Sequence, residues 1–226
     1  MTRGEGSKKP NKIARCAFPL LGWCMLGHFV FLMARTFWKG TPQDAFWISH
    51  VGTLLGGLGA LYRNRRLISV SLVALFLHHF FWLIDTLWWL LTDIFPFGTT
   101  TYLENAALGD WLQSANHFFS VPFLILLAYW QGGVEKHAWV WSTAIFAILT
   151  LISFFFLSPE ANVNSAHRLW PGLDQTHLAI LENLPKGLYL VLLVVLNGLG
   201  NYLPSNLVLR AIYAIILKAQ TRIKRK

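Results

Sequence analysis

Charged residues are scarce in this chain of 226 residues, and their scarcity narrows the class of protein. Only 13% of the residues are charged, whereas 55% are hydrophobic. Apolar runs of about 18–26 residues recur along the sequence, which is long enough to cross a bilayer. The runs are continuous rather than alternating, which disfavours a transmembrane β-barrel. We therefore predict an all-α, polytopic membrane protein.

Cysteine is rare, and common metal-binding motifs are missing. Cys16 and Cys24 lie in one apolar segment without a CxxC pair, so they indicate neither a disulfide framework nor a zinc site. The eight histidines form no HExxH motif and no clustered histidine boxes. We expect no cofactor, although imidazoles at matched depth can ligate haem, which keeps a haem- or metal-binding membrane protein as an alternative. No lysine lies mid-span in the last predicted helix, which disfavours retinal binding.

The net charge of +9 does not indicate nucleic-acid binding. The basic residues cluster at the two termini and in one short loop, where topology and anionic lipid explain them. Residues 1–15 read as a basic cytoplasmic tail. The apolar run that follows has no clear small-residue cleavage site, so an uncleaved first span is favoured over a signal peptide.

Hydropathy and turn residues predict six membrane helices and a final helical run. The turn at 38–42 follows from its Gly and Pro, and Pro204 is expected to end the sixth helix. Gly52-x-x-x-Gly56 is a close-packing pattern of membrane helices. Segment 158–184 is expected to be mostly irregular, with a short amphipathic piece around His177. The predicted helices are 16–34, 45–62, 67–92, 109–130, 138–157 and 186–203, followed by 205–219.

The positive-inside rule selects six spans over seven. With six spans, most of the 19 basic residues are cytoplasmic, and only Arg35, Lys39, Arg168 and Lys186 lie outside. A seventh span would export the basic C-terminus. We therefore predict an integral membrane protein with both termini cytoplasmic, a membrane domain over 16–203, and a cytoplasmic interfacial helix and basic tail over 204–226. No internal repeat or second domain is predicted.

A polar stripe runs part-way along the fourth predicted helix. Asp110, Gln113, His117 and Ser120 recur at +3, +4 and +3, which places them on one helical face. Polar groups in hydrocarbon are costly and often mark function. The stripe therefore suggests a cavity that opens to one side of the membrane.

The topology places several polar residues at one depth in the outer half of the bilayer. His117 and Asp85 each lie about two turns, roughly 10 Å, below the outer ends of their helices. Ser49 and His50 lie just inside the outer end of the second helix, and His28 lies in the outer half of the first. His78 and His79 are expected near mid-membrane as structural residues that point in different directions. Four tryptophans are expected to form an outer aromatic belt: Trp82, Trp88, Trp89 and Trp111.

A serine and a histidine at one depth permit nucleophilic acyl transfer, with lipid esters as the natural substrates. Ser49 would attack, His117 would act as base and acid, and Asp85 or His50 would assist. Thr53, one turn deeper, is the fallback nucleophile. The plainer interpretation is that membrane histidines bond neighbouring helices and that Ser49 caps its helix. A non-enzymatic lipid-binding or assembly protein is then the alternative.

The segment Asn116-His117-Phe-Phe-Ser-Val-Pro122-Phe-Leu-Ile resembles the histidine segment of the androgen-induced membrane hydrolases, multi-pass enzymes that cleave fatty-acid esters. Trp130-Gln-Gly-Gly133 is similar to a related membrane acyltransferase branch. The resemblance implies that His117 is catalytic. The family nucleophile, Thr in one branch and Cys in the other, falls near Trp47-Ile48-Ser49-His50, which implies Ser49. Expected partners are membrane lipids and a lipid-like substrate, with the oligomeric state left open.

Overall fold

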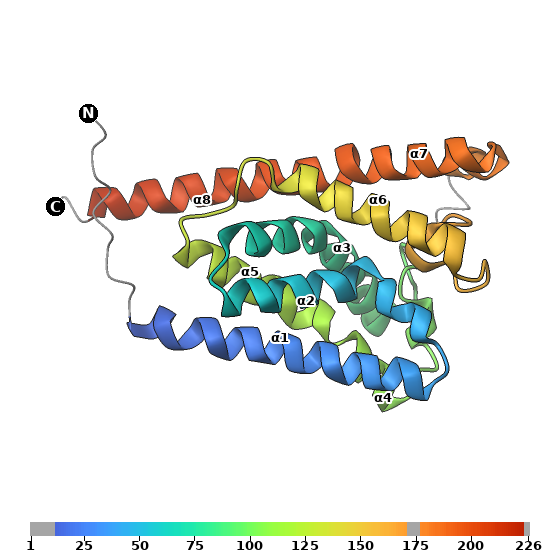
Figure 1. Ribbon diagram of the computed structural model, residues 1–226, viewed down its shortest axis with the longest axis horizontal. Coiled ribbons are helices and arrows are strands. Elements are labelled where there is room, and N and C mark those ends of the chain that lie inside the picture. The colour runs from blue at the N-terminus through green and yellow to red at the C-terminus, as the bar shows by residue number, and fades with distance from the viewer. Residues whose placement is uncertain (1–11, 171–176, 224–226) are drawn as a thin grey trace.

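The computed structural model describes residues 12–170 and 177–223, and all regular structure in those residues is helical. The all-α prediction is confirmed. Figure 1 shows the helices as one elongated bundle, in which α7 and α8 form a long rod along one side. The helices are α1 (Lys12–Trp38), α2 (Ile48–Leu61), α3 (Arg65–Thr92), α4 (Leu108–Ser114), α5 (Asn116–Trp130), α6 (Ala138–Phe156), α7 (Lys186–Asn197) and α8 (Leu203–Ile223).

Five helical segments are long and apolar enough to cross a membrane. They are α1, α3, α4 with α5, α6, and α7 with α8, and they indicate a multi-pass membrane protein. The second of the six predicted spans, 45–62, corresponds to α2, which has 14 residues and is about 21 Å long, shorter than a typical ~30 Å hydrocarbon core. It is shorter than predicted because residues 42–46 form the 3₁₀ turn η1 (Pro42–Phe46).

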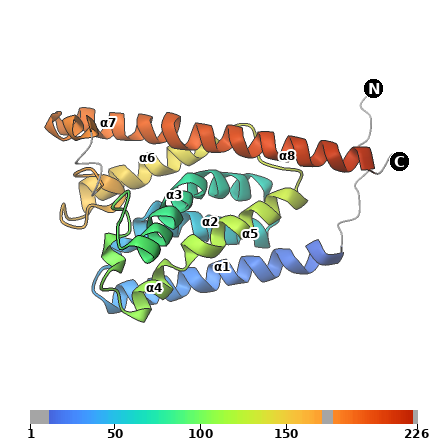
Figure 2. The same ribbon diagram turned by 180° about the vertical axis from the view of Figure 1, so that it is seen from behind.

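The first residues of α1 and the last residues of α8 lie at the same end of the bundle, as Figures 1 and 2 show from opposite sides. The six predicted crossings would give this arrangement if α2 also crosses the membrane. Which side of the membrane that end faces remains a prediction from the charge bias. Most of the expected basic tail, residues 1–11, lies outside the described residues, and α1 already begins at Lys12.

Helix α2 lies against α1 and α3, and its glycines permit the close approach. A Cβ added at Gly52 would collide with Leu75 on α3, and one added at Gly56 would collide with Met25 on α1 and with Leu124 on α5. The Ser71 hydroxyl donates to the carbonyl of Gly52 across the same contact. The Gly-x-x-x-Gly pattern therefore sets how α2 sits in the bundle.

The predicted helix 109–130 is two helices, α4 and α5, that meet at Ala115. The Ala115 N–H donates to the carbonyl of Leu112 at 3.3 Å, and the Phe118 N–H donates to that of Ala115 at 3.0 Å. These bonds span three residues instead of four, which tightens the turn and breaks the α-helical pattern. The break falls directly before Asn116 and His117, so it sets how these side chains are presented.

The prediction that Pro204 ends the sixth helix is wrong. Helices α7 and α8 are joined by a π-helical segment, η5 (Gly198–Tyr202), into one helix of 38 residues, Lys186–Ile223. The Leu203 N–H donates to the Gly198 carbonyl five residues back. A proline ring normally clashes with the carbonyl four residues before it, which here belongs to Gly200 in the wider π turn. The expected separate interfacial helix is therefore a continuation of the sixth span, about 57 Å long in total.

The 158–184 segment is largely irregular, as expected. It contains the short 3₁₀ turns η3 (Val163–Ser165) and η4 (His177–Asn183), while residues 171–176 lie outside the described residues. The segment lies at the end of the bundle where α2 begins (Figure 1). Contacts between η1 and η3 tie it to the start of α2.

Candidate functional site

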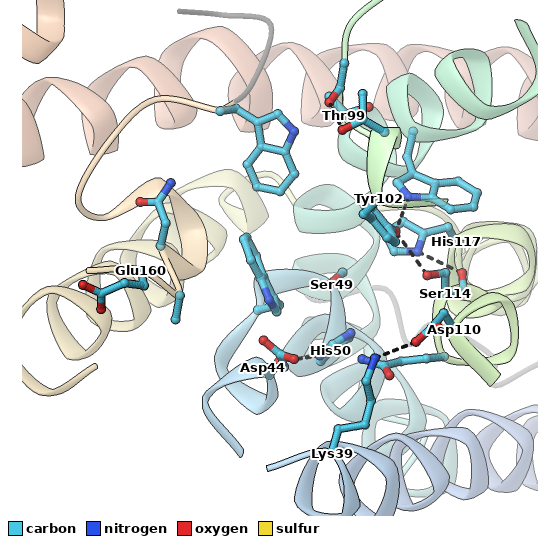
Figure 3. A pocket seen from close by; sticks show the side chains of 18 of the residues that line it. Lys39, Asp44, Ser49, His50, Thr99, Tyr102, Asp110, Ser114, His117 and Glu160 are labelled. Atoms are coloured by element: carbon cyan, nitrogen blue, oxygen red, sulfur yellow. Dashed lines mark hydrogen bonds and ion pairs between the residues drawn. The ribbon is translucent and has the colours of Figure 1, made fainter. Parts of the chain in front are cut away.

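A cavity of about 420 Å³ opens at the end of the bundle where α1 ends and α2 begins. Its walls come from the α1–α2 connection and the first turn of α2, from Trp82 on α3 and the α3–α4 connection, from α4 with the start of α5, and from the 158–170 segment. Figure 3 shows Ser49 and His50 between a wall formed by Tyr102, Ser114 and His117 and an opposite wall that carries Glu160. The polar and charged residues that line the cavity are Lys39, Asp44, Ser49, His50, Thr99, Thr101, Tyr102, Asp110, Gln113, Ser114, His117, Glu160, Asn162 and Arg168.

Ser49 lies in the first turn of α2, and a buried asparagine fixes that turn. The Asn164 side chain accepts from the Ile48 N–H at 2.9 Å and donates to the Phe46 carbonyl at 2.8 Å. Asn164 itself has a left-handed backbone, with φ of 55°. Within the described residues no hydrogen bond engages the Ser49 hydroxyl, whereas the Ser49 carbonyl accepts from Thr53 Oγ1 at 2.8 Å. Ser49 therefore presents a free hydroxyl on a fixed backbone.

His117 is held in one tautomer by the helix break. Its Nδ1 lies 3.0 Å from the carbonyl oxygen of Ser114. A carbonyl only accepts, so Nδ1 carries the proton and Nε2 keeps a lone pair. The ring stacks on Trp82 at 4.4 Å between centroids and 18° between planes, and its centroid lies 4.4 Å from that of His79. His117 thus has the orientation and the free nitrogen that a general base needs.

Trp82 also begins a hydrogen-bond chain that the sequence did not predict. Its Nε1–H donates to the Tyr102 hydroxyl at 2.9 Å, and that hydroxyl lies 3.1 Å from Ser114 Oγ. An indole N–H only donates, so the Tyr102 hydroxyl accepts from Trp82, whereas either hydroxyl can donate in the bond between Tyr102 and Ser114. Burial raises the pKa of Tyr102, which favours the protonated hydroxyl, although the residue as a whole is 53% exposed. The chain connects α3, the α3–α4 loop and α4 around His117.

The expected outer aromatic belt is therefore wrong for Trp82, which is only 5% exposed, whereas Trp88 is 52% exposed. A signal for this was present in the sequence. His79, Trp82 and Asp85 recur at three-residue spacing, which places them on one face of α3. All three are buried, so this is the face that α3 turns inward.

His50 lines the cavity beside Ser49, and its Nδ1 lies 2.6 Å from the carbonyl oxygen of Asp44. This contact leaves Nε2 of His50 as the free ring nitrogen. His28, expected in the same layer, is not a cavity residue; its ring makes an edge contact with Phe119 at 5.1 Å. His78 and His79 diverge as expected. His79 packs on His117, and His78 lies 2.9 Å from Asn201 Nδ2 in the π segment.

Asp85 is buried but does not line the cavity. Its carboxylate accepts from the backbone N–H groups of Phe97 and Thr100 at 2.7 and 2.8 Å, and from the hydroxyls of Thr99 and Thr100 at 2.8 and 2.9 Å. The contacts of Asp85 thus fix the loop that carries Tyr102. The structure places no hydrogen bond between Asp85 and His117 among the described residues.

Only part of the polar stripe on the fourth predicted span reaches the cavity. Asp110, Gln113 and His117 line the cavity, and Asp110 also forms ion pairs with Lys39 at 2.7 Å and with Arg35 at 2.9 Å. Ser120 is fully buried below the cavity and lies 3.1 Å from Thr53 Oγ1. Thr53, the fallback nucleophile, is thus occupied by structural hydrogen bonds, while Ser49 is free.

Within the described ranges no three His, Cys, Asp or Glu side chains are arranged to hold a metal ion. Comparison of the chain with protein-family models, with curated proteins and with solved structures returned no match.

Proposed function

We propose that this protein is a membrane-embedded ester hydrolase or acyltransferase in which Ser49 is the nucleophile and His117 the general base and acid. The observation that carries the proposal is the presence of both side chains in one cavity. The hydroxyl of Ser49 has no hydrogen-bond partner among the described residues, and His117 has its Nδ1 held at 3.0 Å by Ser114. The resemblance of the His117 segment to membrane ester hydrolases points the same way.

The reaction follows from these positions. Ser49 Oγ attacks the ester carbonyl carbon while its proton passes to Nε2 of His117. The ester C–O bond then breaks, and the departing alkoxide takes that proton from His117, which leaves an acyl-Ser49 ester. Water or a second alcohol attacks this ester and gives its proton to His117, which returns it to Ser49 Oγ.

The surroundings supply what each step requires. Ser49 lies in the first turn of α2, where the helix dipole favours negative charge. The N–H groups of Ile48, His50 and Val51 are already bonded. Among the described residues, this leaves the N–H of Ser49 itself as the donor without a partner in this turn. This end of α2 suits the developing oxyanion. Trp82 stacks flat on His117 and stabilises its imidazolium by a cation–π contact. No hydrogen bond joins Ser49 and His117 in the described structure, so the proposal requires the two groups to come within hydrogen-bond reach when substrate binds.

The two residues predicted to assist catalysis, His50 and Asp85, have different roles. His50 adjoins Ser49 in the cavity and assists from its free Nε2. Asp85 does not contact His117, and its oxygens are engaged by the 97–100 loop. The Ser114 carbonyl therefore orients His117, and any contribution of Asp85 acts through the loop.

A serine-reactive lipid-like phosphonate probe tests the proposal directly. We expect the probe to label the wild type, to label Ser49→Ala not at all, and to label His117→Ala at least about 100-fold more slowly, because a general base contributes 10²–10⁴-fold. Ser158→Ala is the matched control, since this serine is exposed outside the cavity. Equal labelling of wild type and Ser49→Ala would refute the proposal and favour a non-enzymatic lipid-binding protein.

A further inference from the structure

The cavity wall is unusual for a protein with this composition. Although 55% of the chain is hydrophobic, no Leu, Ile, Val, Met or Phe is found among the described residues that line the cavity. Burial of an acyl chain is favourable only when apolar groups surround the chain. The described walls thus lack the flexible aliphatic side chains that pack around an acyl chain, and a headgroup with polar edges fits them better.

Apart from Gly98 and Ala161, the apolar groups that line the cavity are aromatic. They belong to Trp47, Trp82, Trp170 and Tyr102, with Trp47 and Trp170 in edge contact at 5.2 Å and 79°. Tryptophan and tyrosine combine a flat apolar face with a polar handle. Such faces suit a ligand that has flat C–H surfaces as well as polar edges.

The polar lining offers both donors and acceptors, and some of them lack partners. The Gln113 Oε1 atom is buried without a hydrogen-bond partner, and the Ser49 hydroxyl is unengaged within the described residues. Because Gln113 lines the cavity, a turn of its amide would bring this unsatisfied acceptor to a ligand hydroxyl, which would remove the cost of burying it without a partner. Thr99 and Thr101 add further hydroxyls to the lining.

The charges of the lining disfavour an anionic ligand. Two cations, Lys39 and Arg168, face three carboxylates, and Lys39 is already paired with Asp110 at 2.7 Å. A phosphate would enter a site with no excess of positive charge. A quaternary ammonium group suits aromatic walls, but it neither donates nor accepts the hydrogen bonds that Gln113 and the hydroxyls offer.

We propose that the cavity binds a neutral sugar or polyol, which is the alcohol part of an acylated sugar lipid. The acyl chain stays outside the cavity, along the apolar helices. The inference rests on the proposed function for the identity of the ester, because Ser49 then attacks the carbonyl joined to a sugar or polyol oxygen. Binding of the headgroup itself does not require the chemical step.

Lipid retention tests this inference without turnover. The Ser49→Ala protein is incubated with an equimolar mixture of monoglucosyl diacylglycerol, phosphatidylcholine, phosphatidylglycerol and diacylglycerol with identical acyl chains, and native mass spectrometry counts the bound lipids. We expect the glucosyl lipid to be retained at least about tenfold over each of the others. The proposal is overturned if phosphatidylcholine, phosphatidylglycerol or diacylglycerol is retained at least as well as the glucosyl lipid. It is also overturned if no lipid is retained.

Variants locate the site. Trp170→Ala and Gln113→Leu are expected to lower glucosyl-lipid retention about tenfold, whereas Gln113→Glu keeps the acceptor oxygen and most of the retention. Trp141→Ala is the control, because Trp141 is half-exposed on α6 beside Arg66 and is not a cavity residue. Since the headgroup preference is measured on the Ser49→Ala protein alone, a further variant that fails to fold does not remove the test.

The two proposals fail separately. Glucosyl-lipid preference without labelling of Ser49 by the phosphonate probe keeps the sugar site and refutes the hydrolase. Labelling of Ser49 without glucosyl-lipid preference keeps the hydrolase and refutes the sugar site.

Discussion

The indole of Trp82 lies flat against the imidazole of His117, with centroids 4.4 Å apart and an interplanar angle of 18°. The same indole donates through Nε1 to Tyr102 at 2.9 Å. Trp82 thus fixes the ring of His117 by its face and the α3–α4 loop by its edge. Substitution of Trp82 can remove the hydrogen bond to Tyr102 with or without the stacking on His117, so the two contacts can be tested separately.

Trp82→Phe keeps an aromatic face but loses the N–H, whereas Trp82→Leu loses both. A cation–π contact contributes about 0.5–2 kcal/mol, so we expect Trp82→Leu to lower kcat/KM for ester cleavage about tenfold below Trp82→Phe. The measurement is initial-rate kinetics of both variants on the same ester. Equal rates would show that the stacked face has no part in turnover.

Asp85→Asn is expected to loosen the loop that carries Tyr102. The wild-type carboxylate accepts four hydrogen bonds from this loop, and bonds to charged groups contribute about 1.5–3 kcal/mol each. Loss of about 2 kcal/mol would speed hydrogen exchange of the Phe97 and Thr100 amides about 30-fold. Asp93→Asn is the control, because Asp93 is exposed and its left-handed backbone tolerates asparagine. Unchanged exchange in Asp85→Asn would contradict the anchoring role.

Gly56→Ala is expected to destabilise the bundle by about 1–3 kcal/mol, since the new Cβ would collide with Met25 and Leu124. Gly27→Ala is expected to have the opposite effect on stability. Nothing lies within 4 Å of a Cβ at Gly27, so the better helix propensity of alanine raises stability by up to about 1 kcal/mol. Thermal unfolding of both variants in detergent measures the contrast. An unaffected Gly56→Ala would show that α2 is not packed as described, and a destabilised Gly27→Ala would show that the face of α1 around Gly27 is not open.

Asp110→Asn removes the carboxylate that Lys39 and Arg35 share. Because these side chains are partly exposed, we expect a modest loss of stability, about 1 kcal/mol or less. The more specific result is the salt response. Added NaCl screens the wild-type pairs and should lower its melting temperature more than that of the variant. Glu104→Gln, on the exposed loop nearby, should leave the salt response of the wild type unchanged.

Gly109→Ala tests the same contact without changing a charge. A Cβ at this position would collide with the Arg35 guanidinium, so the arginine has to leave its place beside Asp110. We expect the salt response of Gly109→Ala to shift toward that of Asp110→Asn, measured in the same melts. A wild-type response would mean that Arg35 accommodates the methyl group without losing its partner.

Much of the candidate site could be predicted from the sequence. The spacing of Asp110, Gln113 and His117 placed them on one face, and all three line the cavity. Their expected depth in the bilayer placed Ser49 and His50 at the level of His117, and both line the same cavity. The same reasoning placed Asp85 at the depth of His117 in the bilayer. Its carboxylate instead binds the 97–100 loop and does not line the cavity. Depth alone does not tell which way a helix is rotated, and that rotation separates these outcomes.

Other features depend on contacts between segments far apart in sequence. Asn164 fixes the start of α2 from 116 residues away, and no local pattern marks it. Continuation of the last helix through Pro204 depends on a π turn, which ordinary helix and turn rules do not anticipate. The break at Ala115 likewise follows no Gly or Pro.

The sequence by itself determined the all-α class, the long apolar helices and the polar face that carries His117. These properties follow from local hydropathy and helical periodicity, which each segment keeps in any fold. Only the tertiary structure decided that Trp82 faces inward against His117, that Thr53 is occupied while Ser49 is free, and that aromatic and polar side chains make the cavity wall. Such choices depend on how each helix is rotated and where each loop crosses it, and the packing of the whole bundle sets both.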